Sequence, residues 1–88
     1  MKIEIFSSPG CGKCGQAKTR LKELLDELMA QQPDLGIEWR EVNILEEMDY
    51  AVDLGVLSAP SLAIDGKLVF TSLPGAKRLR REIEQRSR

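Results

Sequence analysis

Residues 6–15, FSSPGCGKCG, hold both cysteines of the chain and lie where a strand pattern gives way to a helix pattern. Before this stretch, the apolar run at residues 3–6 is typical of a short strand, and the turn residues that follow end it. From Cys14, near the end of the stretch, to Leu28, apolar side chains recur at helical spacing. The stretch therefore predicts a strand, a loop and a helix that ends at about Gln31, before a proline.

The next segment predicts a second strand and a short second helix. Apolar and polar side chains alternate over residues 37–43, as expected of a half-buried strand. The helix that follows ends near Gly55, a residue suited to the left-handed position after a helix. Its apolar positions are Ile44, Met48, Ala51 and Val52.

The last third of the chain predicts a hairpin and a third helix. Residues 61–64 and 67–70 are short apolar runs joined by Asp65-Gly66, a dipeptide that strongly indicates a tight hairpin turn. The helix follows Gly75 and has the inner stripe Ala76, Leu79 and Ile83. The element order is βαβαββα, with the first two strands parallel through a right-handed crossover and the last two antiparallel.

The composition is that of one small globular domain over residues 1–88, with 42% hydrophobic and 31% charged residues. Lys and Arg number 13 against 14 Asp and Glu, so we expect no nucleic-acid partner and interpret the basic C-terminal helix as a solvated face. The N-terminal apolar run is too short and too charged for a signal peptide or a membrane span. We therefore expect a cytoplasmic protein that does not bind membranes.

The motif Cys11-Gly12-Lys13-Cys14 is the main candidate for chemistry, because a lone cysteine pair in the cytosol is more often catalytic or metal-binding than structural. Residues three apart at a helix start can form a disulfide with little backbone movement. The helix dipole and unpaired N–H groups should lower the pKa of the Cys11 thiol, whereas burial favours the neutral thiol of Cys14. We therefore expect Cys11 to attack and Cys14 to resolve. Gly12 keeps the approach to Cys11 clear and Lys13 favours the thiolate, and both are candidate substrate-binding positions.

A metal site is the alternative from a different class. Tetrahedral zinc needs four ligands, and the chain has two cysteines and no histidine. Two chains would each have to give a cysteine pair to a metal or an iron–sulfur cluster. We expect neither a bound cofactor nor a metal.

Taken together, these features resemble the thioredoxin superfamily, in the compact version shared by glutaredoxins and small glutaredoxin-like thioredoxins. The resemblance rests on the element order, the cysteine motif, Ala59-Pro60 before the hairpin and Gly75 after the last strand, and it covers nearly the whole chain. It implies a compact thioredoxin fold, an α/β fold with a four-stranded mixed sheet and helices on both faces.

The resemblance also implies an activity, the reduction of protein disulfides through a mixed disulfide on Cys11 that Cys14 resolves. Pro60 matches the family's cis proline beside the sulfurs, Ala59 would offer its backbone to an extended substrate, and Gly75 matches a glycine that flattens the substrate-facing surface. The implied partners are disulfide-containing proteins and a flavin- or iron–sulfur-linked thioredoxin reductase that donates electrons. We expect this chain to act as a monomer.

The chain departs from the thioredoxin pattern near the sulfurs. Gly10 and Lys13 stand where thioredoxins usually carry a tryptophan and a proline, so their reduction potential cannot be carried over. Ile5 stands where they bury an aspartate near the resolving cysteine. Glu41, on the apolar side of the second strand's alternation, is the candidate acceptor of the Cys14 proton.

A glutathione-linked glutaredoxin is the nearest alternative. Glutaredoxins hold glutathione with a Gly-Gly pair and an acidic residue after the hairpin, and residues 70–74, FTSLP, contain neither. Because nothing in that segment would pair with the ammonium group of glutathione, we expect poor turnover with it.

Overall fold

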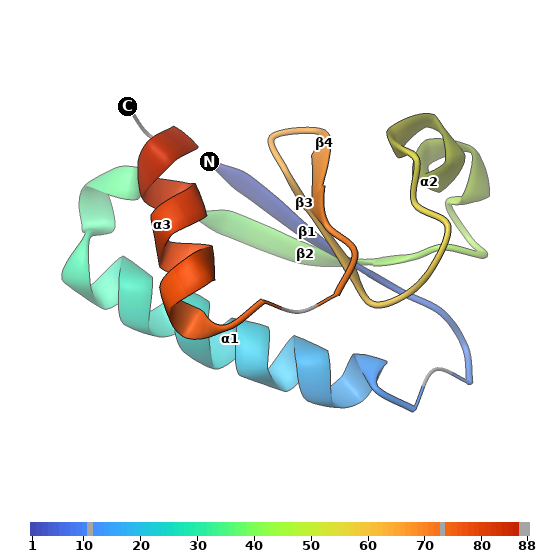
Figure 1. The fold of residues 1–88 in the computed structure, drawn as a ribbon, viewed down its shortest axis with the longest axis horizontal. Helices are drawn as coiled ribbons and strands as arrows, with labels where there is room; N and C mark the ends of the chain where they lie inside the picture. Colours follow the sequence, from blue (N-terminus) through green and yellow to red (C-terminus); the bar gives the residue numbers. More distant parts are fainter. Residues whose placement is uncertain (11, 73, 87–88) are drawn as a thin grey trace.

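The computed structural model describes residues 1–10, 12–72 and 74–86 of the chain. The elements follow the predicted order, with one additional short 3-10 helix, η1 (Figure 1). In chain order they are β1 (Lys2–Ser7), α1 (Cys14–Gln31), η1 (Pro33–Leu35), β2 (Glu38–Asn43), α2 (Met48–Leu54), β3 (Ser61–Ile64), β4 (Lys67–Phe70) and α3 (Ala76–Arg86). Within the described ranges, no helix is both long enough and apolar enough to span a membrane.

The four strands form one mixed sheet in the order β2-β1-β3-β4. β1 and β2 are parallel, with Ile5 opposite Glu41, and β3 is antiparallel to both β1 and β4. The turn between β3 and β4 has φ angles of 50° at Asp65 and 80° at Gly66. Tight hairpin turns with an Asp-Gly sequence need positive φ angles of this kind, and the predicted hairpin is confirmed.

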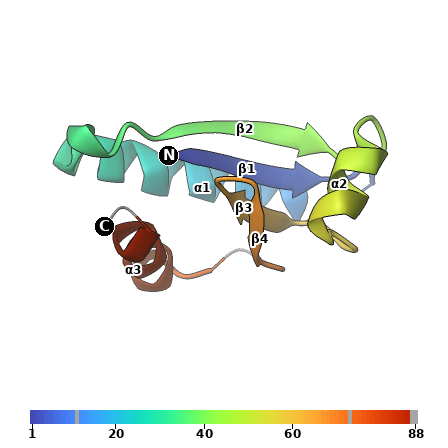
Figure 2. The same cartoon turned by 90° about the horizontal axis from the view of Figure 1, so that it is seen from above.

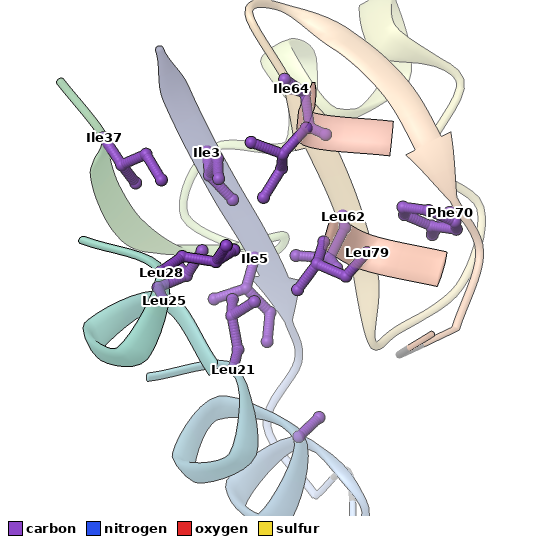
Figure 3. Close-up of a cluster of buried hydrophobic side chains, with 12 residues drawn as sticks. Ile3, Ile5, Leu21, Leu25, Leu28, Ile37, Leu62, Ile64, Phe70 and Leu79 are labelled. Atoms are coloured by element: carbon purple, nitrogen blue, oxygen red, sulfur yellow. The ribbon is translucent and has the colours of Figure 1, made fainter. Parts of the chain in front are cut away.

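The helices cover both faces of the sheet (Figures 1 and 2). Because side chains alternate along a strand, Ile3 and Ile5 of β1 belong to one core and Phe6 to another. The larger core packs α1 and α3 on one face of the sheet (Figure 3). The smaller core packs α2 on the other face and comprises Phe6, Val42, Ala51, Val56 and Ala63. The four-stranded mixed sheet with helices on both faces is therefore confirmed.

The inner face of α2 differs from the prediction at two positions. Ala51 is buried as predicted, but Met48 and Val52 are 53% and 63% exposed, and Tyr50 and Leu54 are half-buried against the smaller core in their place. The helix has seven residues, about two turns, which is too short for periodicity alone to define which side faces the sheet.

Two other predicted helix positions lie at or before a helix start. Ile44 precedes α2 and packs against the smaller core from a turn. Ala76 is the first residue of α3 and is exposed, and the buried stripe begins one turn later with Leu79 and continues with Ile83, as predicted.

A buried carboxylate ties α2 to the sheet. Glu4 of β1 is 1% exposed, and its Oε2 lies 3.0 Å from Nε and 2.8 Å from Nη2 of Arg40. The Tyr50 hydroxyl donates a hydrogen bond to Oε1 of Glu4, and this bond, with burial, raises the pKa of Tyr50. Because Tyr50 is held inward, Met48 and Val52 on the other side of the helix face outward.

Candidate active site

Cys14 is the first residue of α1, at the end of the sheet toward which β1 runs (Figure 1). Its side chain is 5% exposed and shares the buried face of α1 with Ala17 and Leu21, and its sulfur is disulfide-bonded. The low exposure confirms the predicted shelter of Cys14. The N–H groups in the first turn of a helix also lack intrahelical partners and carry the positive end of the dipole.

The other residues of the cysteine motif are placed as follows. Gly12 and Lys13 are exposed, and a Cβ built on Gly12 would meet no atom within 4 Å. Lys13 is the N-cap of α1 and makes no side-chain capping bond there. Cys11 lies outside the described residues, and its role as the attacking thiolate stays a prediction.

The loop before β3 contains a cis peptide bond between Ala59 and Pro60, as the family resemblance implied. The Ser61 hydroxyl donates a hydrogen bond of 2.7 Å to the backbone oxygen of Ser58 and closes a turn around this bond. Ser61 itself lies opposite Phe6, near the end of β1. The loop is therefore fixed at the sheet end from which the chain leads to the cysteine motif.

An open groove brings the cysteine helix and the proline loop together. Lys13 at the N-cap of α1, Ala17 of α1 and Pro60 of the loop line one groove of about 380 Å³. Ala17 lies one helical turn after Cys14, on the same buried face. The two motifs that the sequence singled out, far apart in the chain, are thus neighbours in space.

Gly75, the last predicted substrate-binding residue, accepts the first backbone hydrogen bond of α3 through its carbonyl, from Leu79 at 3.0 Å. It is exposed, and a Cβ there would meet no atom within 4 Å. It lies outside the residues that line the groove. The substrate contact assigned to Gly75 stays a prediction.

Glu41 lies at the α1 side of the sheet but is not buried. Its Oε1 is 3.3 Å from Nζ of Lys18, which stands one helical turn after Cys14, and its side chain is 39% exposed. The strand alternation that pointed Glu41 toward α1 is thus correct, because residues Ile37 and Trp39 pack on that same side. The structure adds Lys18 as its partner, and the proton transfer stays a prediction.

Three further residues at this site were not predicted from the sequence. Gln16, Arg20 and Ser72 also line the groove. Gln16 and Arg20 follow Lys13 at intervals of three and four residues, so helical spacing alone could have placed them on its side of α1. No local sequence signal indicated Ser72, because tertiary packing brings it to the groove.

Comparison with known proteins points to one family. A family model described as a thioredoxin domain matches residues 1–84. A thioredoxin of Methanocaldococcus jannaschii is 31% identical over 86 residues, which cover 98% of this chain and 95% of that protein. A probable thioredoxin of Methanothermobacter marburgensis is 33% identical over 79 residues, with coverage of 90% and 87%.

Solved structures share the fold at lower identity. Thioredoxin 1 of Thermosipho africanus superposes with a TM-score of 0.62 at 20% identity, covering 98% of this chain and 93% of that one. The first two thioredoxin domains of Saccharomyces cerevisiae Eps1p give a TM-score of 0.69 at 24% identity, and this chain spans 34% of that structure.

Proposed function

The chain belongs to the thioredoxin domain family and is a thiol–disulfide oxidoreductase, and we propose that it reduces protein disulfides with Cys11 and Cys14. The observation that supports this best is the sheltered Cys14 at the start of α1, whose preceding residue, Lys13, lines a groove together with Pro60. A sheltered second sulfur next to a substrate groove suits a resolving thiol.

The reaction has two exchanges. The Cys11 thiolate attacks one sulfur of the substrate disulfide, a mixed disulfide forms, and the other substrate sulfur leaves as a thiolate that takes up a proton. Cys14 then loses its proton and attacks the Cys11 sulfur, which releases the second substrate thiol. The substrate gains two electrons and two protons, and the enzyme is left with a Cys11–Cys14 disulfide.

The substrate chain docks beside Pro60. Ala59, half-buried in the cis peptide, would pair its backbone with an extended substrate segment. Leu57, two residues earlier, is 93% exposed and offers an apolar contact at the same loop. Gly12 and Gly75 add surfaces on which no Cβ obstructs a second chain.

Glu41 is proposed to accept the proton of Cys14 during resolution. Its ion pair at 3.3 Å with Lys18, which stands one helical turn after Cys14, keeps it on the α1 side of the sheet. With 39% of its side chain exposed, it can pass the proton on to water.

The oxidised enzyme needs an external donor of two electrons. We propose a thioredoxin reductase, flavin- or iron–sulfur-linked, rather than glutathione. The described part of the segment after the hairpin, residues 70–72 and 74, has no charged side chain to hold the ammonium group of glutathione.

Insulin reduction tests the proposal. The reduced protein with dithiothreitol as donor should precipitate insulin chains much faster than dithiothreitol alone, and Cys11→Ser should abolish the gain. Val52→Ser, at an exposed position of α2 outside the groove lining, serves as the control and should keep full activity. Equal rates with the wild-type protein and with Cys11→Ser would reject the proposed function.

A further inference from the structure

The groove beside Pro60 has an unusual charge for this chain. Among the described residues, its lining is Lys13, Gln16, Ala17, Arg20, Pro60 and Ser72, which comprises two cations and no carboxylate. The whole chain carries a net charge of −1. A local excess of two positive charges at the substrate groove is therefore not a reflection of overall composition.

Neither cation is paired with a carboxylate in the part of the chain that the structure describes. Among the described residues, Lys13 and Arg20 form no ion pair, whereas Lys18, Arg40, Arg80 and Arg86 each do. Glu23, on the next turn of α1, shares a separate surface hollow with Arg20 but does not line the groove. Both cations are exposed and free to meet an anionic ligand.

The two cations are spaced along α1 for an extended ligand. Arg20 is seven positions after Lys13, which is about 10 Å along the helix axis at 1.5 Å per residue. An extended peptide advances about 3.3 Å per residue, so carboxylates about three residues apart could reach both. The Gln16 amide and the Ser72 hydroxyl supply further hydrogen-bond donors to the same ligand.

We propose that this groove binds an acidic peptide segment next to the substrate's disulfide, so that the enzyme prefers disulfides flanked by Asp or Glu. This inference rests on the proposed function, because the peptide must first present its disulfide to Cys11. Carboxylates reach Lys13 and Arg20 while the sulfur lies beside Pro60. A small carboxylate disulfide shares the chemistry but is too short to meet both cations.

Single-turnover kinetics with model disulfides test the preference. Three peptides of equal length, each with one cysteine joined to 2-thiopyridone, carry acidic, neutral or basic flanking residues. Attack of Cys11 on the peptide sulfur releases 2-thiopyridone, whose absorbance gives the rate constant without any reductase. An exposed ion pair contributes up to about a fivefold factor, so we expect the acidic peptide to react about five- to twentyfold faster than the neutral one at low salt. High salt should remove most of this ratio.

Variants of the groove residues test whether the groove causes the preference for acidic peptides. Arg20→Gln and Lys13→Gln should each lower the acidic-to-neutral ratio by about two- to fivefold. The ratio isolates binding, because a change in the Cys11 thiolate would alter all three rate constants together. Lys22→Gln, an exposed cation of α1 outside the groove, is the matched control and should leave the ratio unchanged.

The contrary outcomes distinguish failure of the acidic preference from failure of the proposed function. Equal rate constants for the three peptides would overturn the acidic preference but leave the proposed function intact, whereas failure of all three to react would reject the function itself. The 2-thiopyridyl disulfides of 3-mercaptopropionate and of 2-mercaptoethanol compare a small carboxylate with a neutral analogue. We expect a gain of about twofold at most there, and a gain equal to that of the peptides would reassign the groove to small anionic disulfides.

Discussion

Arg40 Nη2 lies 2.8 Å from the carboxylate of Glu4, across the pair of parallel strands β1 and β2. Among the described residues, Glu4 is the one carboxylate in the buried set, and it lies on the sheet face covered by α2. The ion pair therefore joins β2 to a buried carboxylate whose other partner is the Tyr50 hydroxyl, and it supplies the opposite charge. A buried carboxylate that loses its partner is costly, because the interior cannot solvate it.

Removal of Arg40 should therefore destabilise the fold. We expect Arg40→Leu to lower the free energy of unfolding by about 2 kcal/mol, less than for a fully buried pair because Arg40 is partly exposed. Urea denaturation measures the change, with Lys22→Leu as the control for loss of an exposed cation. The Glu4→Leu/Arg40→Leu double variant should recover part of the loss. A change no larger than that of Lys22→Leu would mean that the pair contributes nothing.

Tyr50 offers a second test of this network, because it is the single tyrosine of the chain. The hydrogen bond to Glu4, with burial, raises its pKa above the ordinary value of 10.0. A raised folded-state pKa means that the contact stabilises the fold fully below pH 10 and that this stability is lost as pH rises through the folded pKa. Tyrosinate absorbance should therefore appear at higher pH in the folded protein than in urea. Titration of Tyr50 at the same pH in the folded protein and in urea would disprove the contact. Tyr50→Phe should remove the part of the stability loss at high pH that comes from ionisation of Tyr50.

The parts of the fold that local signals determine were predictable from sequence. The Asp65-Gly66 turn and the apolar stripe of α1 depend on residues close in the chain, and both match the structure. Met48 and Val52 were wrongly predicted on the inner face of α2, because a contact with Glu4, distant in sequence, holds Tyr50 inward. Charged residues in strands are usually exposed, so Glu4 gave no local sign of its burial.

The candidate site shows the same division. Cys14 was correctly placed on the buried side of α1 by helical spacing, and the cis form of the Ala59–Pro60 peptide bond was inferred from the family resemblance. Arg20 could be placed on the Lys13 side of the helix, but its position across a groove from Pro60 depends on tertiary packing. Sequence periodicity has no means of showing which loop a helix face will meet.

The two cysteines should differ in reactivity after reduction. Cys14 is 5% exposed, so iodoacetamide at neutral pH should label Cys11 much faster, and mass spectrometry of the digested protein measures both rates. Cys14→Ser should accumulate mixed disulfides with substrate because the resolving thiol is gone. Comparable labelling of the two sulfurs would contradict the division of roles.

Glu41→Gln tests the proposed proton acceptor. The variant keeps the size of the side chain but lacks a basic carboxylate, so it should slow resolution of the mixed disulfide by about tenfold or more while its formation changes little. Lys18→Met is the companion variant, because it removes the ion pair and leaves the carboxylate. If Lys18→Met slows resolution as much as Glu41→Gln does, the ion pair is needed to position the Glu41 carboxylate. An unchanged resolution rate in Glu41→Gln would mean that Glu41 is only a surface residue.

The last prediction separates the two possible electron donors. Glutathione has two carboxylates that Lys13 and Arg20 could meet, but its ammonium group needs an acidic partner, and the described residues that line the groove include no carboxylate. We therefore expect poor turnover in a glutathione-coupled assay with a small mixed disulfide, and good insulin reduction when a thioredoxin reductase or dithiothreitol supplies electrons. Ser72→Asp would place a carboxylate in the groove and should raise the glutathione rate several-fold, with Thr71→Asp, outside the lining, as the control. If glutathione drives the wild-type enzyme as fast as a reductase does, the missing acidic partner is not decisive and the enzyme works as a glutaredoxin.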